Sequence, residues 1–337
     1  MKGEKRMEHE KSPWLSVLVP VYNVEAYLHE CIESVLVQCD EGVEIIILDD
    51  QSTDASYQLI GKIAAESKHP LKIIQHEKNS GLSAARNSLI AAATGEYLWF
   101  LDSDDALSEG AISQLRKIVE ENSPDLVMCD YRIWRSEHNL SPKKWQKEQH
   151  VRTFFGPQNT LLKDPFELFS GIYKQGKLHS WSKISKRALW LSELRFPEGR
   201  YFEDMVVTPQ LALSAKTYFY SPSVWVLYRQ RQGSILATAS LQKIEDMSMG
   251  VNNVLDVWLE KYPEMDAKTR FFFIGFCIKI YAFTIKDLKK INSFNSNTLL
   301  LYKMRFYDNI KITKYALLKQ YFLHGRMLKL LKYWRFL

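Results

Sequence analysis

Three carboxylates lie within four residues at the end of an apolar run, in the segment Asp102-Ser103-Asp104-Asp105. The five residues before them, Tyr97 to Leu101, are large and apolar, which predicts a strand buried on both faces. Open α/β folds bind their ligands at the carboxyl ends of such strands. Because like charges this close repel one another, the segment is typical of a site that receives a cation.

The spacing of these carboxylates favours a divalent metal. An Asp-x-Asp turn offers hard oxygen ligands, which suit Mg²⁺ or Mn²⁺ with phosphate oxygens completing the coordination shell. We therefore expect the carboxylates of this turn, Asp102, Asp104 and Asp105, to include the metal ligands. The alternative is a solvated acidic turn that caps a helix beginning near Ser108.

The elements that must position this turn alternate along the first 130 residues. The apolar periodicity predicts strands at 16–21, 43–48, 71–75, from 97 and at 126–129, with helices from 25, around 59–63, at 82–93 and around 112–119. This order predicts right-handed β-α-β crossovers and an α/β fold with a mainly parallel sheet. The second strand also ends in carboxylates, Asp49-Asp50, so both acidic segments should lie at the same edge of the sheet.

The second half is less regular. We expect a helix after Phe202 that runs through Leu213, one or two strands between 217 and 228, and helices from about 240 to the end. The apolar segment Phe271 to Ile285 is fifteen residues long and contains Lys279. Since a membrane span needs about 20 apolar residues, this segment is interpreted as a buried helix.

Composition indicates a globular protein with a substantial core. Hydrophobic residues make up 46% and charged residues 25% of 337 residues. The four cysteines form no Cys-x-x-Cys pair, which favours reduced thiols over a disulfide frame or a zinc site. The charged first dozen residues have no apolar segment, so we expect no secretory signal and a cytoplasmic protein.

The positive charge is concentrated at the C-terminal end. No acidic residue follows Asp308, whereas seven lysines and arginines do, mixed with leucines and aromatic residues. This pattern favours attachment to an anionic membrane surface, such as the inner face of the cell membrane. Two ordinary helices that pack on the protein are the alternative, and nucleic acid is not expected because no recognition motif accompanies the charge.

Five segments in the first 130 residues together resemble the family 2 glycosyltransferases of the GT-A fold, as found in bacterial capsule and lipopolysaccharide assembly. The matching segments keep the family's order and spacing; they are 19–23 (VPVYN), 49–54 (DDQSTD), 79–87 (NSGLSAARN), 95–97 (GEY) and 101–105 (LDSDD). The resemblance implies a GT-A catalytic domain that binds a UDP-sugar and a divalent metal.

The resemblance also implies roles for single residues on the donor side. Pro20, Val21 and Tyr22 would form the wall against which the nucleotide base packs. Asp50 would accept a hydrogen bond from the base, a contact that favours uracil, and Arg86 would lie near the base or the diphosphate. In the acidic turn with Ser103, Asp102 would hold the ribose side and Asp104 the metal, which stabilises charge on the departing UDP.

Weaker likeness continues on the acceptor side, in segments 181–187, 202–204 and 228–235. It implies that Asp204 is the general base that deprotonates the acceptor hydroxyl, with Glu203 orienting it or binding the acceptor. Acidity at a helix N-terminus is the structural alternative for this pair. Arg229 and Arg231 would clamp the diphosphate or an anionic acceptor, or remain solvated.

Two residues depart from the family pattern. Gln51 stands where glycine is usual, so the turn there is expected not to rely on a freely adopted positive φ. Ser182 stands where relatives commonly have asparagine, which leaves its contact with the acceptor open.

These observations predict an inverting, metal-dependent transferase of a hexose or N-acetylhexosamine from a UDP-sugar to a saccharide or lipid-linked saccharide, in surface polysaccharide or lipopolysaccharide synthesis. The expected domains are a catalytic domain at 13–235, with a donor half at 13–130 and an acceptor half at 131–235, and a helical basic region at 236–337. A binding module without catalysis, a metal-dependent phosphatase or a nucleotidyltransferase are the alternatives; Ala106 and the segment Tyr22 to Glu25 disfavour the last two.

Overall fold

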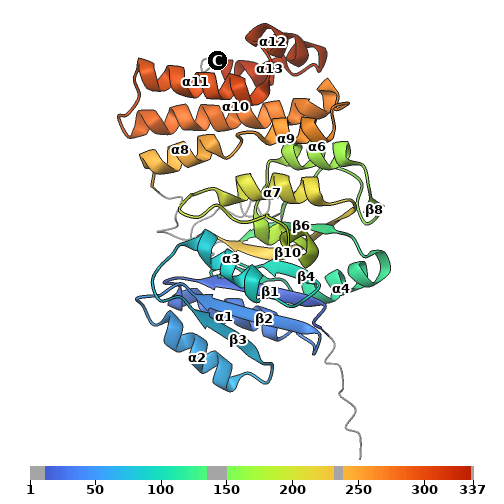
Figure 1. The fold of residues 1–337 in the computed structure, drawn as a ribbon, viewed down its shortest axis with the longest axis vertical. Helices are drawn as coiled ribbons and strands as arrows, with labels where there is room; N and C mark the ends of the chain where they lie inside the picture. Colours follow the sequence, from blue (N-terminus) through green and yellow to red (C-terminus); the bar gives the residue numbers. More distant parts are fainter. Residues whose placement is uncertain (1–11, 135–149, 231–237, 335–337) are drawn as a thin grey trace, which may run out of the picture.

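The computed structural model describes residues 12–134, 150–230 and 238–334. Figure 1 shows one sheet with its covering helices at one end of the molecule and a stack of helices at the other. The α/β architecture with a helical C-terminal region agrees with the predicted fold class.

The described strands form one sheet in the order β3-β2-β1-β4-β9-β6-β10-β5, with β7 paired to β6 and β8 to β10. The pairs β3-β2, β2-β1, β1-β4 and β6-β10 are parallel, and the pairs with β9, β5, β7 and β8 are antiparallel. The bounds are β1 Leu15–Val21, β2 Val43–Asp49, β3 Leu71–Gln75, β4 Tyr97–Phe100, β5 Ala106–Leu107, β6 Leu126–Trp134, β7 His150–Val151, β8 Leu161–Leu162, β9 Lys183–Lys186 and β10 Tyr218–Arg229.

The helices of the sheet region lie on both of its faces. Successive residues of β1 point to opposite sides, so Val17 and Val19 pack in one core cluster and Leu18 in the other. The bounds are α1 Glu25–Leu36, α2 Ser56–Glu66, α3 Leu82–Ala92, α4 Ala111–Asn122, α6 Pro165–Gln175 and α7 Glu203–Ser214, with 3₁₀ turns at Ser180–Ser182 and Arg187–Trp190.

Two glycines hold positions that other residues would not adopt freely. A Cβ added to Gly95 would lie 2.6 Å from the backbone nitrogen of Ser16, so only glycine lets the chain enter β4 beside the beginning of β1. Gly81, which precedes α3, has a φ of 87°. The first glycine therefore serves a close approach and the second a positive φ.

The C-terminal region consists of helices stacked on α6 and α7 (Figure 1). Its bounds are α8 Leu241–Met249, α9 Val254–Lys261, α10 Ala267–Lys290, α11 Ser296–Ile310, α12 Lys314–Leu323 and α13 Met327–Leu331. The long helix α10 contains the segment 271–285 and buries Phe273 and Ile274, which confirms the predicted buried helix. Among the described residues, no helix has the length and apolar character that a bilayer crossing needs.

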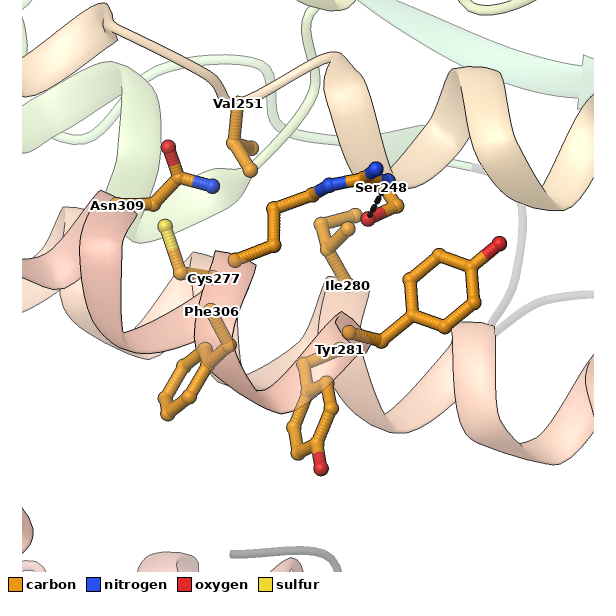
Figure 2. Close-up of a pocket in the computed structure, with 9 residues that line it drawn as sticks. Ser248, Val251, Cys277, Ile280, Tyr281, Phe306 and Asn309 are labelled. Atoms are coloured by element: carbon orange, nitrogen blue, oxygen red, sulfur yellow. Dashed lines mark hydrogen bonds between the residues drawn. The ribbon is translucent and has the colours of Figure 1, made fainter. Parts of the chain in front are cut away.

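A small pocket lies between α8, α10 and α11, lined by Cys277 and Tyr281 among others (Figure 2). Two of its polar side chains bond to protein partners: Arg305 donates to the Ser248 hydroxyl at 3.0 Å and Asn309 donates to Asn252 at 2.9 Å. These bonds make the pocket a packed joint between helices.

One hydrophobic cluster continues from the sheet into the C-terminal helices. It includes Leu18 of β1, Ile172 of α6, Leu211 of α7 and Phe273 of α10, all buried. The predicted division near residue 235 therefore crosses a shared core, and the domain boundaries stay a prediction. One smaller correction concerns the strands: β6 extends to Trp134. Residues 218–229 form a single strand, in agreement with the prediction of one or two strands there.

Candidate active site

The acidic turn lies at the end of β4, beside the end of β1. Leu101 donates a backbone hydrogen bond to Leu18 at 3.0 Å, which continues the parallel pairing up to the turn. The amide of Asp105 then donates to the carbonyl of Asp102 at 2.9 Å and closes the turn. Asp102 and Asp104 are half-buried, while Ser103 and Asp105 are buried. The predicted edge of the sheet thus carries the predicted carboxylates.

Arg86 of α3 connects this turn to the acceptor side. Its guanidinium is almost fully buried and donates to Asp102 at 2.8 Å, to Glu203 at 2.6 Å and to Asp204 at 3.4 Å. Burial by itself would lower the pKa of Arg86, but these three carboxylates raise it. The prediction placed Arg86 near the base or the diphosphate, whereas the structure gives it three protein carboxylates as partners.

Asp204 and Glu203 begin α7 and differ in exposure. Phe202 precedes them with a φ of 59°, a left-handed conformation that turns the chain sharply into the helix. The Asp204 side chain is 18% exposed and accepts from the Ser180 hydroxyl, while the Glu203 side chain is 11% exposed. Asp204 is thus the more accessible of the two carboxylates.

Three carboxylates share one guanidinium in this cluster, which affects the protonation of Glu203. Burial and the neighbouring Asp204 together raise the pKa of Glu203 to about 7, although Arg86 acts in the opposite direction. A single positive charge cannot compensate three negative charges. Glu203 therefore takes up a proton as the pH falls through about 7.

Arg229 at the end of β10 holds the acidic turn from the other side. Its backbone amide donates to Asp105 at 2.8 Å and its Nε donates to the carbonyl of Asp104 at 2.8 Å. Its guanidinium also pairs with Glu30 and lies 3.8 Å from the Trp134 ring centroid. Arg229 is therefore a neighbour of the donor turn, and Arg231 lies outside the described residues.

Asp105 supports the turn from within. Its Oδ1 accepts from Arg229, and its Oδ2 is buried without a hydrogen-bond partner among the described residues. Burial, followed by Asp102 and Asp104, raises its pKa well above the usual range. A buried carboxyl that favours its protonated form is a weaker metal ligand than its half-exposed neighbours.

Asp50 at the end of β2 is occupied by the loop that precedes α3. It accepts hydrogen bonds from the amides of Ser80 at 2.9 Å and Gly81 at 2.7 Å, and from His76 Nδ1 at 2.7 Å. The residue is 3% exposed. The structure thus shows Asp50 organising this loop, and the expected contact with the base stays a prediction.

His76 is a site residue that the sequence analysis missed. Its second ring nitrogen contacts the Ser88 hydroxyl at 2.9 Å, so it bridges Asp50 to α3. A histidine after a short strand gives no motif signal. Its position becomes visible only when β3 is placed beside β2.

The predicted base wall is divided in the structure. Tyr22 is 45% exposed, whereas Pro20 and Val21 are buried in β1. Among these three side chains, only that of Tyr22 is therefore exposed enough to stack on a base. The turn beside it is held by Asn23, whose side-chain oxygen Oδ1 accepts a hydrogen bond from the backbone amide of Thr53 at 2.8 Å.

Gln51 adopts the conformation that glycine would adopt freely. Its φ is 58°, although the sequence led us to expect that this turn would not rely on a positive φ. This turn therefore holds a non-glycine residue in a strained, left-handed backbone conformation.

The acceptor-side segment at 179–183 is a buried polar layer. Ser182 donates to the carbonyl of His179 and accepts from Lys183 Nζ at 2.7 Å, which gives it a structural role inside the protein. Burial lowers the pKa of Lys183 to about 8 and that of His179 to about 3. Ser180 is the member of this segment that reaches Asp204, and sequence analysis did not single it out.

The donor set fits a divalent metal held by few protein ligands. Among the described residues, no group of three or more His, Cys, Asp or Glu side chains is gathered as a metal site. Mg²⁺ and Mn²⁺ commonly use one or two carboxylates together with phosphate oxygens. The negative charge of the turn also acts on the nearby Cys31 thiol. Burial raises the pKa of this thiol most, and Asp105, Asp104 and Asp102 raise it further. The half-exposed Asp102 and Asp104 fit such an ion.

Comparison with known families identifies the family to which this chain belongs. Residues 16–173 match the model of glycosyl transferase family 2. The chain belongs to this family. The match contains β1, β2, β4 and the acidic turn, and it confirms the family and the enzyme class that the motifs predicted.

Two curated relatives show how far the likeness extends. Glycosyltransferase GlyA of Streptococcus pneumoniae serotype 4 is 30% identical over 227 residues, which cover 66% of this chain and 31% of GlyA. The minor teichoic acid biosynthesis protein GgaB of Bacillus subtilis is 38% identical over 136 residues, or 38% of this chain and 15% of GgaB. The chain thus spans about a third of GlyA and less of GgaB.

A solved structure confirms the fold over nearly the whole chain. TarS residues 1–349 of S. aureus, in complex with UDP-GlcNAc, superpose with a TM-score of 0.59 and 21% identity, covering 93% of this chain and 92% of that one. Because this match extends through the C-terminal helices, the GT-A sheet and the helical region occur together in both proteins.

Proposed function

We propose that this family 2 glycosyltransferase moves a hexose or N-acetylhexosamine from a UDP-sugar to a saccharide hydroxyl, with inversion, in the synthesis of a bacterial surface polysaccharide. The observation that carries the proposal is the Arg86 cluster, which places the donor-side Asp102 and the acceptor-side Asp204 on one guanidinium. TarS, described with UDP-GlcNAc, supports a UDP-sugar donor, and GgaB supports a cell-surface polymer as product.

The reaction that fits is a single displacement. Asp204 would accept the proton of the acceptor hydroxyl as that oxygen attacks the anomeric carbon from the face opposite the diphosphate, and UDP would depart. Ser180 and Arg86 orient the Asp204 carboxylate. Tyr22 would stack on the base, and Asp50 would fix the loop beside it.

Asp102 and Asp104 would hold Mn²⁺ or Mg²⁺, which supplies positive charge for the departing diphosphate. Arg229 positions this turn through the Asp104 carbonyl and Asp105. Asp105 enters the proposal as the internal support of the turn, since its Oδ1 is engaged and its Oδ2 is buried.

The test is donor hydrolysis. The protein is incubated with UDP-Gal, UDP-Glc, UDP-GlcNAc, UDP-GalNAc and GDP-mannose, with Mn²⁺ or with EDTA, and nucleoside diphosphate release is measured. We expect UDP release from one of the UDP-sugars that requires the metal and is lost in Asp104→Ala. Release without metal, release of GDP alone, or full activity of Asp104→Ala would overturn the proposal.

A binding module without catalysis would bind the same donors and release nothing. Turnover separates the two possibilities, because both would keep their UDP affinity in Asp204→Asn in calorimetry, but only an enzyme shows turnover that this variant loses. The buried cluster that joins Asp102 to Asp204 favours the enzyme, since a module has no need of a carboxylate oriented on the acceptor side.

A further inference from the structure

Six cations gather where α6, α10 and α13 meet, although they come from distant parts of the sequence. We call this set the cationic surface; it consists of Lys174, Lys177, Lys279, Arg326, Lys329 and Lys332. Lys174 Nζ lies 5.2 Å and Arg326 Cζ 5.3 Å from the centroid of the same Phe272 ring. Burial lowers the pKa of Lys174, and the charges of Arg326 and Lys329 lower it further. Burial also lowers the pKa of Lys279, and Lys329, Lys177 and Lys332 add to this effect. The six charges are therefore neighbours in space.

No carboxylate of the described residues forms an ion pair with any of these six cations. Elsewhere in the C-terminal region cations do have partners, since Arg305 pairs with Glu245 and Lys311 with Asp256. Like charges that face one another without counter-charges destabilise the folded state. An anionic partner would remove this repulsion.

The same helices expose large apolar side chains. Leu328 of α13 is 84% exposed, and Phe322 and Leu323 of α12 are 73% and 69% exposed. Phe155, 46% exposed, lies against Lys174, whose Nζ is 2.8 Å from its ring centroid. Exposed apolar residues next to lysines are typical of protein surfaces that insert into the boundary of an anionic bilayer.

We propose that the cationic surface, with the exposed apolar side chains of α12 and α13, docks on an anionic lipid bilayer. Nucleic acid would use the cations but leave the exposed leucines in water, so a bilayer accounts for both halves of the surface. Figure 1 shows α12 and α13 at the end of the molecule opposite β3 and α2, so docking leaves the donor edge of the sheet accessible.

The surface also connects to the acceptor side of the site. Lys177 follows α6 directly, and its carbonyl accepts from Lys183 Nζ at 3.0 Å. Three residues later Ser180 reaches Asp204. Docking through α6 and α13 would thus bring the acceptor side near the bilayer. Membrane docking goes beyond the proposed function because it says where the transfer takes place. The experiment below measures membrane binding alone and needs no sugar transfer.

The experiment is co-sedimentation with vesicles of phosphatidylcholine, with and without phosphatidylglycerol. We expect the wild-type chain to bind only the anionic vesicles, and less strongly as salt is raised. Each lysine near an anionic surface contributes about fivefold in affinity, so the double variant Lys329→Gln/Lys332→Gln should bind about 25-fold more weakly. Both residues are exposed, and neither belongs to the proposed catalytic machinery.

The matched control is Lys62→Gln/Lys68→Gln, which removes the same charge from exposed residues in and just after α2, at the opposite end of the molecule. It should bind like wild type. Leu328→Ser should weaken binding about tenfold or more, because a leucine side chain leaves the bilayer boundary. Neutral vesicles that bind equally well, a control that loses as much as the test variant, or an RNA oligonucleotide that binds while Leu328→Ser has no effect would each overturn the proposal.

Discussion

At the scale of single residues, the site is organised by Arg86. This side chain is almost fully buried and serves three carboxylates from two distant segments. Removal of one partner from a buried ionic group typically costs about 3–5 kcal/mol, because the remaining charges are left uncompensated. Lysine offers a single ammonium group in place of the planar fork that reaches several carboxylates.

The first prediction concerns Arg86. Arg86→Met should lower the free energy of unfolding by about 3–5 kcal/mol, and Arg86→Lys should recover only part of it. Thermal and urea unfolding measure both. Arg187, whose Nε donates to the carbonyl of Gly95, is the control: Arg187→Met removes an arginine that pairs with no carboxylate of the described residues, and it should cost less. Equal losses in both variants would contradict the role of Arg86.

The second prediction separates the neighbouring carboxylates of α7. Asp204→Asn keeps the shape of the side chain but loses the proton acceptor, so transfer should fall by about 10²–10⁴-fold while UDP-sugar affinity stays nearly unchanged. Glu203→Gln should reduce the rate less. Turnover and calorimetric titration under one set of conditions check the pair. If Glu203→Gln is the inactive variant, the base is one residue earlier; if both remain active, the base lies elsewhere.

The third prediction follows from the raised pKa of Glu203. Its folded pKa of about 7 lies above its ordinary value, so the stability that its protonation provides is present below about pH 4.5 and is lost as the pH rises toward 7. Glu203→Gln should flatten the decline of the melting temperature over this window. An unchanged slope between pH 5 and pH 7 in the variant would contradict this assignment.

At the scale of elements, the turns determine where the site residues point. Gln51, Asn23 and Phe202 all have positive φ values, between 52° and 59°, and all lie beside donor or acceptor residues. Strained backbone of this kind persists where the surrounding contacts hold it in place. Here the contacts are those of Asn23 with Thr53 and of Asp54 with the amide of Ser56 at 2.9 Å.

The fourth prediction tests the strain in one turn. Gln51→Gly should raise the free energy of unfolding by about 1 kcal/mol, because glycine adopts a positive φ without a Cβ clash. Gln58, exposed within α2, is the control: Gln58→Gly should lower stability by about 1 kcal/mol. Chemical unfolding measures both, and a loss in both variants would show that Gln51 makes contacts worth more than its strain.

The elements were the part that the sequence predicted well. Apolar periodicity placed β1, β2 and β3 and the helices α1, α3 and α4 within a few residues, and the acidic segments located the sheet edge. Side-chain partners were not predictable in the same way. The three carboxylates around Arg86, the contact of His76 with Asp50 and that of Ser180 with Asp204 join residues 16 to 118 positions apart, and only the packed fold brings them together.

At the scale of the whole molecule, the sheet and the C-terminal helices share one hydrophobic cluster. The cluster that includes Leu18 and Leu211 also includes Phe273 and Leu288 of α10. Buried apolar surface of this kind contributes about 25 cal/mol per Å², so its exposure is costly. Asp204 itself belongs to α7, which lies beneath these helices (Figure 1).

The fifth prediction follows from this shared core. A chain that ends after residue 237 should fail to fold cooperatively, because α6 and α7 would lose the cover of α10. A chain that ends after Lys311 keeps α10 and α11 and should fold with a lower melting temperature. Circular dichroism and thermal unfolding compare the two. A sharp, wild-type-like transition in the shorter chain would show that the predicted boundary near residue 235 separates independent domains.

The shared guanidinium has a consequence for how this site can change over time. Asp102, Glu203 and Asp204 all depend on Arg86, so a substitution at any one of them alters the effect of a substitution at the others. While Arg86 is present it partly compensates the charge of Glu203; once Arg86 is lost, a neutral residue in place of Glu203 removes a larger repulsion, so the effect of that replacement depends on Arg86. Substitutions at these positions are therefore tolerated only in particular orders. Residues 86, 102, 203 and 204 should accordingly vary together across lineages.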